Sequence, residues 1–322
     1  MIFEIRHITQ YQYDEPVRES VMELWMQPRT TATQRLLEFE LDVDPHAQLF
    51  AYADSWGNRV NHFDLPHPHS QLNIAARSLV ECAPPPPTPR TVESSEWEGL
   101  EQDVVRGDCW DFLSPHGFAR ETQALRDFCI GRGIPELTRK DPLTALGALN
   151  SLLYHGLEYE AGVTAADSPI DHALKAGQGV CQDFAHIMIA ICRGWGVPAR
   201  YVSGYLATDR AAGERSNPDA THAWVEVFLP SLRWIGFDPT NNVLASERHI
   251  AVAIGRDYAD IPPSRGVFKG AAESQLSVGV SVRPAAAIHD EAEFLRLGAP
   301  AIAAARRRVA SAALLDHHHQ QQ

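Results

Sequence analysis

The sequence predicts an α+β protein, in which an N-terminal antiparallel β-sandwich domain precedes a core of helices packed on an antiparallel sheet. Residues 37–44 alternate apolar and acidic side chains without interruption, and residues 72–80 repeat this period of two. The period is typical of strands that bury one face. Residues 181–194 instead place apolar side chains at intervals of three and four, as an amphipathic helix does. We therefore expect strands in the first part of the chain and helices at the start of the second.

A run of prolines separates these two parts. Four consecutive prolines at residues 84–87, followed by Pro89, cannot donate hydrogen bonds to a sheet and favour a stiff, extended linker. We assign residues 1–83 to the N-terminal β domain and residues 84–117 to a proline-rich linker and connecting segment. A proline-rich recognition motif is the alternative interpretation of the same run.

The second part is predicted to contain helices first and antiparallel strands after them. Together they form a core domain at residues 118–283. Helices are expected at residues 118–131, 142–156 and 181–194, and strands at residues 199–206, 222–229, 234–237 and 275–282. Residues 284–322 have the composition of an Ala-rich helical tail. Its end, from His317 to Gln322, is expected to be disordered, with metal capture by the histidines as the alternative.

The composition limits the partners and the location of the protein. Of its 322 residues 44% are hydrophobic, which is enough for a buried core without disulfides or metals. The formal net charge of −13 argues against nucleic-acid binding, which needs clustered Lys and Arg. No apolar stretch approaches the length of a membrane span, and the charged residues 1–7 do not resemble a signal peptide. We therefore expect a cytoplasmic protein with neither nucleic acid nor membrane as a partner.

Cys181 differs from the other cysteines in its position. The five cysteines have no paired spacing, so reduced thiols are expected. Cys181 follows Gly177 and Gly179 and opens the 181–194 helix, where unpaired N–H groups and the helix dipole favour a thiolate. Cys192 lies on the apolar stripe of the same helix and is better explained as a small buried hydrophobe. That explanation is also the alternative for Cys181.

A base and its partner follow at the ends of two predicted strands. His222 begins one strand after a long polar loop, and Asp238 ends the next strand before Pro239. Because two short strands joined by a tight turn run antiparallel, these far ends become neighbours. Asp238 can then accept from one imidazole nitrogen of His222 while the other nitrogen faces a thiol. The alternatives are a turn-forming aspartate before proline and a capping or surface histidine.

Four ordered motifs resemble the bacterial transglutaminase-like family. They are GVCQDFAH at residues 179–186, PARYVSGY at 198–205, THAWVEV at 221–227 and GFDPTN at 236–241. Residues 7–17 and 54–58 resemble the N-terminal β domain that accompanies this core, and residues 249–258 resemble the stretch after it. The resemblance extends to about residue 283 and does not include the Ala-rich tail.

This resemblance implies a papain-like transglutaminase core with Cys181, His222 and Asp238 as a catalytic triad. The animal transglutaminases that crosslink proteins depend on calcium, but the sequence has no Asp-rich calcium loop of the EF-hand type. The Cys and His residues also lack metal-ligand spacing, so a structural zinc site is only a third hypothesis. We expect no cofactor and no metal.

The triad predicts a cysteine-nucleophile hydrolase or acyl transferase that acts on amide or peptide bonds through a thioester. Water resolves the thioester in a peptidase or amidase, and an amine resolves it in a transglutaminase. Hydrolysis is favoured, because crosslinking requires a specialised amine channel that the sequence does not display. The backbone N–H of Cys181 is the natural donor for half of an oxyanion hole, and the second donor stays unassigned. A non-catalytic, transglutaminase-like scaffold for protein interaction is the alternative.

Overall fold

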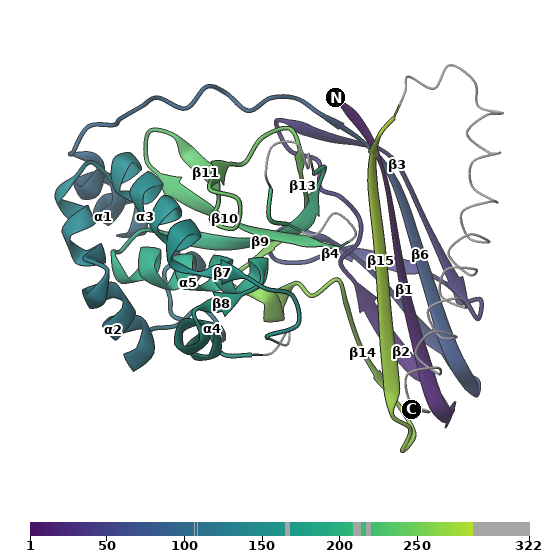
Figure 1. Ribbon diagram of the computed structural model, residues 1–322. Coiled ribbons are helices and arrows are strands. Elements are labelled where there is room, and N and C mark those ends of the chain that lie inside the picture. Colours follow the sequence, from purple (N-terminus) through teal and green to yellow (C-terminus); the bar gives the residue numbers. More distant parts are fainter. Residues whose placement is uncertain (106, 108, 165–167, 209–213, 217–219, 286–322) are drawn as a thin grey trace. The chain divides into compact units, whose positions relative to one another are not determined.

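The strands of the N-terminal region belong to two four-stranded sheets (Figure 1). The computed structural model describes residues 1–105, 107, 109–164, 168–208, 214–216 and 220–285. The first sheet has the order β15 (Ser274–Pro284), β1 (Ile2–Val17), β6 (His69–Cys82) and β3 (Gln34–Asp44). The second has the order β14 (Ser264–Phe268), β2 (Ser20–Leu24), β5 (Arg59–Leu65) and β4 (Phe50–Ala53). Pairs such as β3 with β6 and β2 with β5 are antiparallel.

Apolar side chains from both sheets meet in one core. Val43 of β3 and Ile74 of β6 are buried there, together with Leu24 of β2 and Phe63 of β5. Because each sheet supplies inward-facing residues to the same cluster, this region is an antiparallel β-sandwich. The fold class predicted for the N-terminal region is confirmed.

The last strands of the described chain complete these two sheets. β15 pairs with β1 from Phe3 opposite Pro284 to Tyr13 opposite Ser274, and β14 pairs with β2. Residues 264–284 therefore hydrogen-bond to N-terminal strands, although the sequence places them at the end of the core domain. The domain boundaries themselves stay a prediction, and the predicted helical tail lies almost wholly outside the described residues.

The chain between the sandwich strands β6 and β14 contains the helices and a five-stranded sheet. The sheet has the order β12 (Val243–Leu244), β11 (Arg233–Asp238), β10 (His222–Leu229), β9 (Ala199–Leu206) and β13 (His249–Gly255), with antiparallel neighbours. The helices are α1 (Glu96–Val105), α2 (Gln123–Gly131), α3 (Pro142–Gly156), α4 (Ile170–Ala176) and α5 (Cys181–Gly194). Shorter pieces are η1 (Trp110–Phe112), η2 (Ile134–Arg139), η4 (Tyr258–Asp260), β7 (Glu158–Tyr159) and β8 (Gln178–Gly179). The predicted α+β core is confirmed.

Helix α2 begins later than the sequence predicts. Its expected start was residue 118, but the Phe118 N–H donates to the Asp257 carboxylate at 3.1 Å and precedes the helix. Thr122 then caps α2, because its hydroxyl accepts from the Leu125 N–H at 3.1 Å. Helices α3 and α5 have the predicted bounds.

Helix α5 packs against β9 and β10 and is buried along most of its length. Near its end, the buried Arg193 guanidinium donates to five backbone carbonyls, those of Phe112, Ser114, Ala119, Ala199 and Arg256. A buried guanidinium without such partners would be costly, so these bonds hold the helix end in place.

Among the described residues, no helix has both the length and the apolar character needed to cross a membrane.

Side-chain amides hold the outer edge of β13, which is the last strand of the five-stranded sheet in the described chain. Gln34 donates from Nε2 to the Ala251 carbonyl and accepts at Oε1 from the Ala251 N–H, both at 2.8 Å. Asn58 forms the same pair of bonds with Ile254, at 2.7 and 2.9 Å. The N-terminal region therefore supplies β13 with the hydrogen-bond partners that a neighbouring strand would supply.

Candidate active site

Cys181 is the first residue of α5 and is half-buried. Immediately before it, β8 pairs in parallel with β7, which holds the chain that leads into the helix. Gly177 ends α4 with a φ of +68°, a left-handed conformation that favours glycine. Gly179 has a different role, which is to make room for the Asp183 side chain. A Cβ at Gly179 would lie 2.8 Å from Asp183 Oδ2.

The Asp183 carboxylate caps the helix that carries Cys181. Its Oδ2 accepts from the Val180 N–H at 2.9 Å and from the Thr164 hydroxyl at 2.7 Å. Burial raises the pKa of Asp183, and these two hydrogen bonds oppose that rise. The cap fixes the first turn, so Cys181 is held at the positive end of the helix dipole.

His222 and Asp238 lie side by side at the ends of adjacent strands. β10 and β11 are antiparallel with Val225 opposite Phe237, so the start of β10 lies beside the end of β11. His222 Nε2 is 2.8 Å from Asp238 Oδ2, and the two residues are only 3% and 0% exposed. Because an ionised carboxylate only accepts, Nε2 carries the proton of this bond. The structure thus brings together the two strand ends that the sequence predicted to meet.

The Asp238 carboxylate accepts hydrogen bonds from five N–H groups. Oδ1 accepts from the backbone N–H groups of Thr240 and Asn241, at 3.0 and 3.2 Å. Oδ2 accepts from His222, from Asn241 Nδ2 at 2.7 Å and from His249 Nε2 at 3.2 Å. Burial alone would raise the pKa of Asp238, but the charge and hydrogen bond of His222, with the bond from His249, hold it well below its usual range.

The other imidazole nitrogen of His222, Nδ1, is left for the thiol, because Nε2 is hydrogen-bonded to Asp238. Cys181 is close enough to His222 to contribute to its pKa. The Ser216 hydroxyl also lies 3.4 Å from Nδ1. Burial by itself lowers the pKa of His222, but Asp238 and then Cys181 outweigh burial and raise the pKa to about 10. The imidazolium form is therefore favoured at this site.

His249 is a third titratable group at the same carboxylate, and His222, Asp238 and His249 lie close enough together to hold a metal ion. The Ser246 N–H donates to His249 Nδ1 at 3.1 Å, so the proton of the neutral ring is on Nε2. A protonated nitrogen has no lone pair for a metal, and Asp238 Oδ2 already accepts three hydrogen bonds. This set of donors fits a hydrogen-bond network better than a metal centre.

The remaining cysteines have the surroundings of unreactive thiols. Cys192 is fully buried, and burial raises its pKa to about 12. Burial also raises the pKa values of Cys82 and Cys129 to about 11, and Cys109 is buried as well. Cys181 differs from them in its place at a helix start and in its histidine partner.

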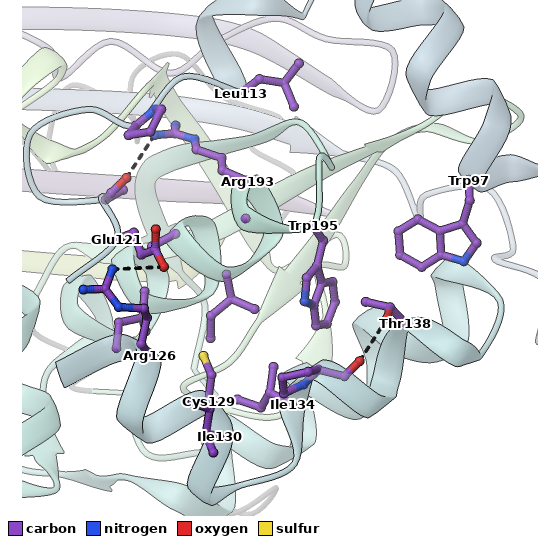
Figure 2. A pocket seen from close by; sticks show the side chains of 17 residues that line it. Trp97, Leu113, Glu121, Arg126, Cys129, Ile130, Ile134, Thr138, Arg193 and Trp195 are labelled. Carbon is purple, nitrogen blue, oxygen red and sulfur yellow. Dashed lines mark hydrogen bonds and ion pairs between the residues drawn. The ribbon is translucent and has the colours of Figure 1, made fainter. Parts of the chain in front are cut away.

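A separate cavity of about 680 Å³ opens at the opposite end of α5 (Figure 2). Arg193 and Trp195 line it from the end of that helix, together with Cys129 of α2 and Trp97 of α1. Gly194 lies thirteen positions after Cys181, and at about 1.5 Å of rise per residue the helix puts roughly 20 Å between them. This cavity is therefore not part of the site around Cys181.

Sequence reasoning did not identify the side chains that surround the triad, namely Asp183, Ser216, Asn241 and His249. Asn241 carries a usable signal, because a polar residue shortly after Asp-Pro is typical of a turn that hydrogen-bonds the aspartate. His249 has no such signal. It lies in a motif of the family resemblance, but its contact with Asp238 depends on how the sheet is assembled.

Comparison with known protein families gives two matches along the chain. The bacterial transglutaminase-like N-terminal region matches residues 3–81, and the transglutaminase-like superfamily matches residues 135–239. An uncharacterized protein of Mycobacterium tuberculosis is 35% identical over 294 residues, which cover 88% of this chain and 92% of that protein. A protein-glutamine gamma-glutamyltransferase of Pseudomonas aeruginosa is 31% identical over 121 residues, which cover 33% of this chain and 17% of that protein.

A solved structure shares the fold. It belongs to a candidate cysteine protease from Cytophaga hutchinsonii, with a TM-score of 0.67 and 24% sequence identity, and the likeness covers 89% of this chain and 92% of that one. The likeness therefore includes the N-terminal sandwich as well as the helices and sheet that carry Cys181, His222 and Asp238. By these matches the chain belongs to the transglutaminase-like superfamily.

Proposed function

We propose that the protein is a cysteine-nucleophile hydrolase or acyl transferase that acts on amide or peptide bonds, with hydrolysis favoured. Cys181 attacks, His222 moves the proton and Asp238 orients His222. The observation that carries the proposal is the position of His222, whose Nε2 lies 2.8 Å from the Asp238 carboxylate and whose pKa is raised by Asp238 and by the neighbouring Cys181. Thiol catalysis uses this arrangement of nucleophile, base and orienting group.

The first half-reaction starts from a thiolate–imidazolium pair. The pKa of His222, raised to about 10, keeps its imidazole protonated at neutral pH beside the Cys181 sulfur. The thiolate adds to the amide carbon, and the carbonyl oxygen takes the negative charge. When this intermediate collapses, the C–N bond breaks and the Nδ1 proton of His222 passes to the departing amine. A thioester on Cys181 and a neutral His222 remain.

The backbone N–H of Cys181 is suited to stabilise the oxyanion of that intermediate. It belongs to the capped first turn of α5, where N–H groups point toward the positive end of the helix dipole. A fixed donor of this kind requires no rearrangement as the negative charge develops.

The second half-reaction decides between hydrolysis and transfer. His222 takes a proton from water, the new C–O bond forms, and the C–S bond breaks to release the acid and restore the ion pair. An amine in place of water would give a new amide. We favour water because amine transfer requires a site that excludes water and holds the amine. The activity named for the Pseudomonas aeruginosa relative supports acyl transfer as the second outcome of the same chemistry.

Selective alkylation tests the nucleophile. At pH 7 and with limiting iodoacetamide, we expect the native protein to be labelled at Cys181 about tenfold or more faster than at its other cysteines. Burial raises the pKa values of Cys82, Cys129 and Cys192 to about 11 to 12, so these thiols should react slowly with iodoacetamide. Peptide mass spectrometry gives the rate at each site. His222→Gln should slow the labelling of Cys181 alone, and equal rates at all five cysteines would contradict the proposal.

Trapping of the acyl-enzyme tests the reaction. The protein is mixed with a peptide pool, quenched in acid, and examined for a mass adduct on Cys181 that hydroxylamine removes. A thioester followed by a free acid product indicates hydrolysis, and a thioester followed by an amine-exchanged product indicates transfer. Absence of any adduct, together with full rescue of a deletion strain by Cys181→Ala, would favour a non-catalytic scaffold.

A further inference from the structure

We propose that His249 is a positioning residue of the triad, which acts as a fixed N–H donor from strand β13 and orients the Asp238 carboxylate and, through it, His222. The inference rests on the proposed function, because the role is defined by the reactivity of Cys181. It assigns His249 no contact with the substrate.

The protein backbone determines which nitrogen of His249 donates. The Ser246 N–H donates to Nδ1 at 3.1 Å, which requires the ring proton to be on Nε2. Nε2 then donates to Asp238 Oδ2 at 3.2 Å. The side chain is only 2% exposed, and burial lowers its pKa, so the ring stays neutral with one tautomer. His249 is therefore a donor of fixed direction.

Asp238 has no comparable donor from elsewhere in the described chain, apart from His222 itself. Three of its five hydrogen bonds come from Thr240 and Asn241, which belong to the turn that follows Asp238 and move with it. His249 lies on β13, and β10 and β9 separate β13 from the β11 strand of Asp238. The bond from His249 thus ties the carboxylate to the far side of the sheet.

Trp224 supports both histidines. Its indole stacks with the His222 ring at a centroid distance of 6.0 Å and meets the His249 ring edge-on at 5.3 Å. Gly204 of β9 leaves the space for the indole, because a Cβ there would lie 2.8 Å from Trp224 Cη2 and would clash with the Ile250 carbonyl oxygen. His222 and His249 therefore rest on one indole while both direct Nε2 at Asp238 Oδ2.

The N-terminal region holds β13 in place. The paired bonds from Gln34 to Ala251 and from Asn58 to Ile254 fix the backbone of this strand two and five residues after His249. The position of the donor is therefore set by the β-sandwich as well as by the five-stranded sheet.

Variants of His249 separate positioning from a purely structural role. His249→Phe keeps a ring against Trp224 but has no donor, whereas His249→Gln keeps an N–H that can reach Asp238. His69→Phe is the matched control, because His69 is also buried and lies 2.9 Å from the Ser20 hydroxyl in the sandwich. For each full-length variant, the alkylation rate of Cys181 is measured from pH 4 to pH 10, and thermal unfolding is measured in parallel.

A carboxylate that is no longer held stabilises the imidazolium less, so the thiolate should form at higher pH. We expect His249→Phe to raise the pH of half-maximal Cys181 alkylation by about one unit, a roughly tenfold slower reaction on the acid side. His249→Gln should stay close to the wild type. His69→Phe should lower the unfolding temperature and leave the pH profile unchanged.

An unchanged profile for His249→Phe would overturn the inference, because a structural role alone would lower the unfolding temperature without moving the profile. A shift to lower pH would overturn it too, since His249 would then compete with His222 for the carboxylate. His249→Leu offers the same test, with a smaller side chain and no donor, if the Phe variant does not fold. Slow alkylation of Cys181 in the wild type would refute the proposed function itself, whereas a reactive Cys181 with an unmoved profile would refute only the role of His249.

Discussion

At Asp238 and His222, burial and charge act in opposite directions. Burial would raise the pKa of Asp238 and lower that of His222, yet Asp238 is shifted down and His222 up, to about 10. The charges prevail because the two groups are 2.8 Å apart in a site that excludes water, where the attraction is weakly screened. The pair therefore stays ionised at neutral pH, which is the state that the proposed mechanism requires.

Asp238→Asn tests this charge without changing the size of the side chain. The amide can donate to His222 Nε2 and so favour the tautomer with its proton on Nδ1, which can no longer accept the proton of Cys181. We expect the alkylation of Cys181 at pH 6.5 to slow by about 100-fold. Asp257→Asn is the control, because Asp257 is fully buried and bonded to His116 at 2.9 Å. An unaltered rate in Asp238→Asn would show that the charge is dispensable.

At the scale of elements, the site is assembled from one helix start and three strands. α5 supplies Cys181 through a turn that Asp183 caps, and β10 and β11 supply His222 and Asp238. Gly204 of β9 has no side chain, which leaves room for the Trp224 indole to lie against the strand. The pairing of β10 with β11 determines which side chains meet in the triad.

Gly204→Ala should therefore disturb both the sheet and the site. The added Cβ would clash with the Ile250 carbonyl of β13 and with the Trp224 indole. We expect a loss of about 1–3 kcal/mol in the free energy of unfolding, measured with urea, and slower alkylation of Cys181. Gly279→Ala in β15 is the matched control, because a Cβ there meets nothing within 4 Å. Equal stability of the two variants would argue against the close approach at Gly204.

At the scale of the whole molecule, buried histidines make stability depend on pH. His7 of β1 lies 3.0 Å from the Tyr205 hydroxyl of β9 and joins the sandwich to the five-stranded sheet. Burial lowers its pKa to about 4 and that of His186 to about 3, from a usual value of 6.5. His222 shows the opposite shift, with its pKa raised to about 10.

The direction of each pKa shift determines the pH range in which that histidine adds to the free energy of unfolding. Between pH 6.5 and pH 4 the unfolded chain binds protons that folded His7 and His186 do not. The free energy of unfolding should therefore fall as the pH falls, by up to about 1.4 kcal/mol per pH unit for each histidine. The contribution of His222 is fully present below pH 6.5 and is lost as the pH rises through 10. Stability should thus be highest close to pH 6.5.

Urea unfolding at a series of pH values measures these slopes. His7→Gln should make the decline between pH 6.5 and pH 4 shallower by up to about 1.4 kcal/mol per pH unit, whatever its effect at neutral pH. His46→Gln changes an exposed histidine and should leave the slope as in the wild type. Parallel curves for wild type and His7→Gln would exclude His7 as a source of the acid sensitivity.

Local pattern by itself determined the elements that carry the chemistry. The apolar stripe of α5 and the glycines before it placed Cys181 at a helix start, and the hairpin of β10 and β11 placed His222 beside Asp238. These features depend on neighbours within about twenty residues, so periodicity and turn residues are sufficient to predict them. The predicted start of α2 is wrong, because a hydrogen bond to the distant Asp257 holds Phe118 outside the helix.

Only the tertiary structure decided what surrounds the triad. The contacts of Asp238 with His249, of Ala251 with Gln34 and of β15 with β1 join residues that local patterns do not relate, and Gln34 lies 217 residues before Ala251. Such contacts depend on the order of strands in a sheet and on which buried polar groups need partners. Sequence pattern determined which groups are candidates for the chemistry, and packing decided how each of them is held.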